Sequence, residues 1–130
     1  MNLKNLGWNS TFDDFIKDKN IKDLIPGRVT NQNGKHYKIM TQEGEHNAIL
    51  SNSFLNSIKN KSEIPAVGDW VGLKKNIDIN TCHIQILFPR KNRLSRKVAG
   101  KKSEEQIIAS NIDVAFIITS VDQDFNIRRL

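Results

Sequence analysis

The chain has 130 residues, of which 38% are hydrophobic and 26% are charged, so it is long enough for one folded domain with a core. No stretch approaches the roughly 18 apolar residues that cross a bilayer, and the N-terminus lacks the basic end and apolar centre of a signal peptide. We therefore predict a cytoplasmic protein without a membrane partner. The single cysteine, Cys82, excludes an internal disulfide and a thiolate-rich zinc site within one chain.

The N-terminal segment predicts a short helix over residues 12–19, capped by Ser10 or Thr11. Asp13 and Asp14 would then lie near the positive end of the helix dipole. We expect this helix to be a packing appendage.

The central part of the chain predicts a meander of short strands, because apolar and polar residues alternate between turn signals. Residues 27–32 lead into Asn33-Gly34, a dipeptide that readily takes the two positive φ values of a tight hairpin turn. Residues 36–42 form the return strand. Glu43-Gly44 then offers a second turn before a third strand over residues 46–52.

Residues 52–66 interrupt this alternation with helical spacing, and Pro65 ends any helix there. Residues 68–75 and 83–89 predict a fourth and a fifth strand, the last with Ile84, Ile86 and Phe88 facing inward. In a five-stranded Greek-key barrel, a helix or long loop commonly links the third and fourth strands. We therefore predict an all-β fold, a five-stranded OB-fold Greek-key barrel with short helical appendages; an SH3-like barrel is the alternative.

The formal charge of +6 is concentrated in residues 90–102, which we call the basic strip. It carries seven basic side chains and no acidic one, whereas the other 117 residues carry 13 basic and 14 acidic side chains. Such a strip suits a polyanion, since each phosphate that it neutralises releases condensed counterions. The alternative is a solvated loop that is basic only for solubility.

After the basic strip, residues 103–110 predict a short helix that starts with Glu104 and Glu105, and residues 111–120 predict a strand that is apolar on both faces. A strand of this kind normally lies inside an α/β sheet. We therefore expect the natural protein to continue beyond Leu130. In the isolated chain, this terminal strand would be mobile or would pair with a second copy of an otherwise monomeric protein.

Six motifs now stand in order along the chain: LGW at 6–8, GRV at 27–29, PAVGDWV at 65–71, FPRKNRLSRK at 88–97, EQIIASNIDVAFIITS at 105–120 and DFNIRRL at 124–130. Together they resemble the family of ribosome small-subunit-dependent GTPases A. The resemblance implies an N-terminal OB-fold, then a circularly permuted GTPase domain and a small zinc-binding domain. It also implies a role in late maturation of the small (30S) ribosomal subunit, which stimulates GTP hydrolysis.

The chain departs from that family by lacking a GxxxxGKS phosphate loop, an NKxD guanine-reading motif and a Cys/His cluster for zinc. In the permuted order, these elements would follow residue 130. The resemblance thus implies an OB-fold RNA-binding domain over residues 1–103 and the first strand of a truncated α/β GTPase domain within 104–130. GTP, magnesium and zinc are expected only for the missing regions, and the chain alone is not expected to hydrolyse GTP.

The resemblance further implies that the OB domain docks on 16S rRNA of the small ribosomal subunit. OB-folds generally bind nucleic acid on the face of strands two and three. The predicted RNA-binding residues are Arg28, Lys35, His36, Lys38, Lys74 and Lys75, together with Arg90, Lys91, Arg93, Arg96, Lys97, Lys101 and Lys102 of the basic strip.

Other conspicuous side chains receive structural interpretations. Tyr37 shares its alternation with Ile39, and Trp70 lies between valines, so we predict that both are in the core. Asp69 is expected to fix a turn. The three histidines are scattered, so we assign no metal, and no catalytic constellation stands out. RNA binding has one alternative that the sequence leaves open, in which the chain is an OB-type protein-interaction module without rRNA binding. A third function, that of a stand-alone enzyme, has the least support from the sequence.

Overall fold

The computed structural model describes residues 3–18, 23–75, 81–97 and 105–120. In chain order, its elements are η1 Leu3–Leu6, α1 Ser10–Asp18, β1 Ile25–Asn33, β2 His36–Thr41, β3 Gly44–Leu50, α2 Asn52–Ser57, η2 Lys61–Glu63, β4 Trp70–Lys75, β5 Thr81–Leu87, β6 Arg93–Lys97 and β7 Glu105–Ser110.

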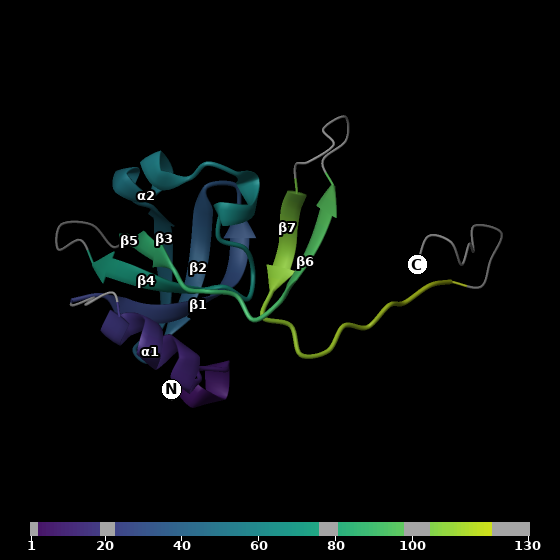
Figure 1. Cartoon of the computed structure of the whole chain (residues 1–130), viewed down its shortest axis with the longest axis horizontal. Coiled ribbons are helices and arrows are strands. Elements are labelled where there is room, and N and C mark those ends of the chain that lie inside the picture. The colour runs from purple at the N-terminus through teal and green to yellow at the C-terminus, as the bar shows by residue number, and fades with distance from the viewer. Residues whose placement is uncertain (1–2, 19–22, 76–80, 98–104, 121–130) are drawn as a thin grey trace.

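Strands β1 to β5 form a closed barrel in the order β1-β2-β3-β5-β4, with β4 pairing back onto β1 (Figure 1). The β3–β5 ladder is parallel and the other ladders are antiparallel. Helix α2 lies in the connection between β3 and β4, and Ser51 caps it by accepting a hydrogen bond from the Phe54 N–H. The predicted five-stranded OB-fold is thereby confirmed.

The first hairpin turn differs by one position from the prediction. Asn33 is the last residue of β1, and it pairs with His36, so the turn consists of Gly34 and Lys35. Only Gly34 has a positive φ, of 62°, which is the pattern of a type II′ turn. The second turn also differs by one position: Thr41 pairs with Gly44, so the turn consists of Gln42 and Glu43 rather than Glu43 and Gly44. Gly44, with a φ of 112°, begins β3.

The barrel interior is filled by alternating side chains of all five strands, including Val29, Ile39, Leu73 and Ile84, none of which is more than 1% exposed. The inward face predicted for β5 is only partly right. The β4–β5 register shifts after Gly72, so that Leu87 packs against the interior while Ile86 packs outside it. A β-bulge of this kind reverses the faces that follow it.

A second, aromatic core joins α1 to the outside of the barrel. Its centre consists of Phe12, Trp70 and Phe88, and Trp8 packs on all three with ring centroids 5.0–5.6 Å apart. Trp70 is therefore buried, as predicted, but between the barrel and the N-terminal segment. The predicted helix exists, but it begins at Ser10, and the Asn9 side chain caps it by accepting from the Thr11 N–H.

Strands β6 and β7 form an antiparallel hairpin beside the barrel (Figure 1). The helix predicted over residues 103–110 is wrong, because Glu105–Ser110 pairs with Arg93–Lys97 and buries Ile107. The strand predicted over residues 111–120 is also wrong: this segment has no strand partner among the described residues, and Val114, Phe116, Ile117 and Ile118 are exposed. The boundary expected at residue 103 falls between the two paired strands, and the assignment of 104–130 to a second domain stays a prediction.

None of the helices within the described ranges is long and apolar enough to cross a membrane.

Gly68 lies where the barrel meets β7, and its replacement by alanine should destabilise the protein. Its φ is 95°, and a Cβ atom would lie 2.1 Å from the carbonyl oxygen of Ser110. Gly34 is the matched control, because it also has a positive φ but faces open space. We expect Gly34→Ala to lower the free energy of unfolding by about 1–2 kcal/mol. The loss in Gly68→Ala should be larger than the loss in Gly34→Ala by about 1–3 kcal/mol. Urea denaturation measures both, and equal losses would contradict the close packing of β7 on Gly68.

Candidate nucleic-acid interface

Within the described residues, the basic strip predicted from sequence consists of residues 90–92 and of β6, which is one strand of the β6–β7 hairpin. Its exposed cations are held in weak surface contacts: Lys91 Nζ lies 3.2 Å from Asp113, Arg93 Nε lies 3.0 Å from Glu105, and Arg96 Nε donates to Gln106 at 3.1 Å. Lys97 is exposed at the end of β6. Lys101 and Lys102 lie outside the described residues. The hairpin therefore presents several cations to solvent beside the barrel.

Arg90, the first residue of the basic strip, has a different environment. Its side chain is only 12% exposed, and its guanidinium donates from Nε and Nη2 to the two carboxylate oxygens of Asp69 at 2.8 Å. The remaining donors reach the carbonyl oxygens of Ser62 and Ile64. With its donors engaged in this way, Arg90 holds the hairpin on the barrel and offers little to an RNA phosphate.

Asp69 is the fully buried acceptor of this network. Besides the Arg90 guanidinium, its carboxylate accepts hydrogen bonds from the Ala66 N–H at 2.7 Å and from the Ser110 hydroxyl on β7. The Asp69 backbone pairs with Val29 of β1. The predicted turn-fixing role is confirmed, and the same carboxylate also ties β7 to the barrel.

Tyr37 supports the same turn from inside the barrel. It is 2% exposed, which confirms the core interpretation, and its hydroxyl donates to the Pro65 carbonyl at 3.1 Å. Burial, reinforced by the negative charge of Asp69, raises the pKa of Tyr37 to about 12.

Arg28 is also a structural residue rather than a free cation. Its guanidinium donates to three backbone carbonyls, those of Leu6 at 2.6 Å, Gly68 at 3.0 Å and Asn111 at 2.8 Å. These carbonyls come from the N-terminal segment, the turn before β4 and the end of β7. Arg28 thus fastens three distant segments, which the sequence prediction of RNA binding did not anticipate.

The remaining predicted residues, which are exposed, lie on the barrel and are not gathered with the hairpin: Lys35, His36, Lys38, Lys74 and Lys75. Lys38 lies 3.6 Å from Glu45, and Lys75 forms an ion pair with Glu43. The hydrogen bond from Lys75 lowers the pKa of Glu43, and the same bond raises the pKa of Lys75. The face of β2 and β3 is therefore of mixed charge.

Comparisons with known proteins place this architecture in context. The chain is 31% identical over 137 residues to the small ribosomal subunit biogenesis GTPase RsgA of Syntrophotalea carbinolica, a match that covers all of the chain. The RsgA protein of Leptospira interrogans is 33% identical over 98% of the chain. This chain is RsgA-like and resembles the N-terminal part of that family. It spans 37% and 34% of the length of these two RsgA proteins.

No protein-family model matches the chain. A solved structure titled as YloQ, a circularly permuted GTPase, matches 55% of this chain and 24% of that one, with 17% identity and a TM-score of 0.44.

Sequence analysis missed Asn111, which joins the hairpin to the barrel. Its side chain accepts from the Lys91 N–H at 2.7 Å and donates to the Gly68 carbonyl at 2.9 Å. Asn111 has a φ of 52°, a conformation in which asparagine is enriched. An asparagine directly after an apolar strand was the available signal for this turn.

No group of three or more His, Cys, Asp or Glu side chains that could hold a metal is found within the ranges that the structure describes.

The buried ion pair predicts a large effect of replacing Arg90. Arg90→Met would leave the Asp69 carboxylate buried and uncompensated, so we expect the free energy of unfolding to fall by about 3–5 kcal/mol. Lys91→Met is the matched control, because Lys91 forms an ion pair with Asp113 in which the two side chains are 65% and 82% exposed. Such an exposed pair should contribute less than about 1 kcal/mol. Urea denaturation of both variants checks this. Similar small losses would show that Arg90 does not hold the hairpin.

Tyr37 is the only tyrosine, so its ionisation can be followed by the ultraviolet absorbance of tyrosinate. We expect a midpoint near pH 12 in the folded protein, against about 10 in the unfolded chain. Since the folded pKa is the higher one, the stabilisation is fully present below pH 10 or so and is lost as the pH rises toward 12. A folded-state midpoint near 10 would contradict the buried phenol.

Proposed function

We propose that this chain is an RNA-docking module of a small-subunit biogenesis GTPase and that it binds 16S rRNA through the cations of the β6–β7 hairpin. The names of its relatives support the association with small-subunit assembly. The observation that carries RNA binding is the gathering of Arg93, Arg96 and Lys97 on the exposed strand β6, with Lys91 two residues before that strand. A concentrated cationic surface of this kind suits the sugar-phosphate backbone.

The ion pairs on the hairpin do not prevent such binding. An exposed salt bridge contributes only about 0–1 kcal/mol, so an RNA phosphate can replace the carboxylate partner at little cost. Arg93 can then grip two phosphate oxygens, and each neutralised phosphate releases counterions. Arg28 and Arg90 remain with their protein partners, so they are no longer among the proposed RNA contacts.

The larger setting of this proposal rests on the family that the sequence motifs resemble. A longer protein of this type would bind GTP with magnesium, carry zinc in its C-terminal region and act in the cytoplasm during late maturation of the 30S subunit. In that setting, residues 104–130 would begin the GTPase domain. The chain itself would serve as a monomeric docking module.

A protein-interaction module is the second candidate, because the hairpin and the segment that follows it expose apolar side chains. Leu94 and Ile108 are 48% and 50% exposed, and residues 114–118 include Phe116 and Ile118 at 86% and 92%. Such a surface fits a protein partner or a second copy. Titration with 16S rRNA fragments at two salt concentrations separates the candidates, since only RNA binding weakens steeply with salt.

Charge reversal on the hairpin tests the RNA proposal. In a variant with Arg93→Glu, Arg96→Glu and Lys97→Glu, we expect the affinity for 16S rRNA fragments to fall at least tenfold or so, and the slope of log affinity against log salt to decrease by about 2–3. Fluorescence anisotropy between low and moderate salt measures both, and thermal unfolding checks that the variant is folded.

The control carries the same change in net charge at three exposed lysines that are spread over the molecule, with Lys17→Glu, Lys35→Glu and Lys74→Glu. It should lose much less affinity than the hairpin variant. Equal losses in the two variants, or no loss in the hairpin variant, would refute docking through the hairpin.

A further inference from the structure

A second basic segment lies next to the hairpin, although it is about 30 residues away in the sequence. Lys59 and Lys61 precede and begin η2, and both are exposed. Helix η2 contacts β7, and the Arg90 guanidinium donates to the carbonyls of Ser62 and Ile64. The turn that carries the two lysines is thus fastened to the base of the hairpin.

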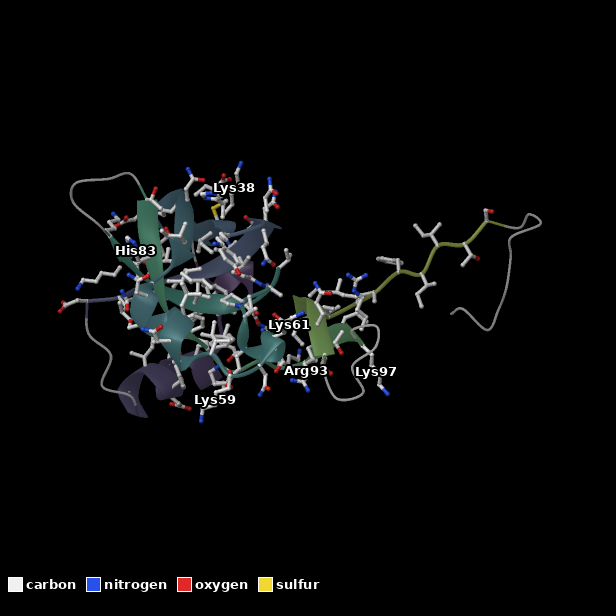
Figure 2. All side chains as sticks on the ribbon, turned by 90° about the horizontal axis from the view of Figure 1, so that it is seen from above. Lys38, Lys59, Lys61, His83, Arg93 and Lys97 are labelled. Carbon is white, nitrogen blue, oxygen red and sulfur yellow. The ribbon has the colours of Figure 1, made fainter. Side chains whose placement is uncertain are left out.

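This connection brings the two basic segments to one side of the molecule. In Figure 2, Lys59, Arg93 and Lys97 lie in the lower part of the view and Lys61 lies nearer its centre, where the barrel meets the hairpin, whereas Lys38 of β2 lies at the upper edge. Helix η2 contacts β7, and β7 pairs with β6, the strand that holds Arg93 and Lys97.

The acidic residue of the second segment, Glu63, is directed to the backbone. Its carboxylate accepts from the N–H groups of Lys59 and Asn60, and these hydrogen bonds lower the pKa of Glu63. By contrast, residues 36–50, which form the face of strands two and three, contain one lysine and two glutamates. The usual nucleic-acid face of an OB-fold is therefore the less favourable surface for phosphate here.

We propose that Lys59 and Lys61 extend the hairpin cations into one continuous phosphate-binding surface, and that RNA binds across η2 and β6 rather than over β2 and β3. This inference rests on the proposed function, because it names the rest of the surface that the RNA contacts. Arg90 and Asp69 act as positioning residues, since they hold the two basic segments together without contacting the phosphates.

The test compares two double variants of the full chain. Lys59→Glu with Lys61→Glu reverses the proposed surface, and Lys35→Glu with Lys38→Glu makes the same charge change in the β1–β2 turn and on β2, beside the conventional face. With a 16S rRNA fragment as the probe, we expect the first pair to lower affinity about tenfold and to reduce the salt slope by about 1.5. The second pair should change affinity less than about twofold.

Each outcome decides between the two proposals. If Lys59 and Lys61 have no effect while the hairpin triple variant still loses affinity, the extension is refuted and the proposed function stands. If the conventional face loses as much affinity as the proposed one, the extension is likewise refuted. If the hairpin variant itself binds normally, the proposed function fails. Lys59→Gln with Lys61→Gln provides the same readout, with half the charge change, should the glutamates disturb the turn.

Discussion

The structure depends on one buried carboxylate. Asp69 is fully enclosed, and it collects hydrogen bonds from its own turn, from Arg90 at the start of the hairpin and from Ser110 at the end of β7. A buried charge is costly unless it is paired and hydrogen-bonded, so these groups must be in place together. The barrel and the hairpin are therefore joined by a contact that tolerates little rearrangement, and the hairpin cations have a fixed place beside the barrel.

The basic side chains divide into two groups according to their surroundings. Arg28 and Arg90 use several planar donors to bridge backbone carbonyls and a buried carboxylate, a task that suits a guanidinium. Lys91 and the β6 residues Arg93 and Arg96 make surface contacts, which a phosphate can replace. The first group holds segments of the protein together, and the second is the group for which we propose RNA contacts.

The sequence predicted the barrel well because its strands alternate in polarity and are separated by glycine turns. It could not reveal the bulge that turns Ile86 out of the barrel, since alternation alone does not register an extra residue. Residues 105–110 became a strand instead of a helix because pairing with β6 overrides local preference. The roles of Arg28 and Arg90 were missed for a similar reason, as charge along the sequence does not show which carbonyls fold toward a guanidinium.

The most direct test of this account is to map the backbone amides of the chain by nuclear magnetic resonance during titration with a 16S rRNA fragment. RNA docking through the fixed cationic surface predicts that chemical-shift changes concentrate in residues 59–63 and 91–97, with little change over residues 36–50. Changes confined to β2 and β3, or a spectrum that does not respond to RNA, would contradict it.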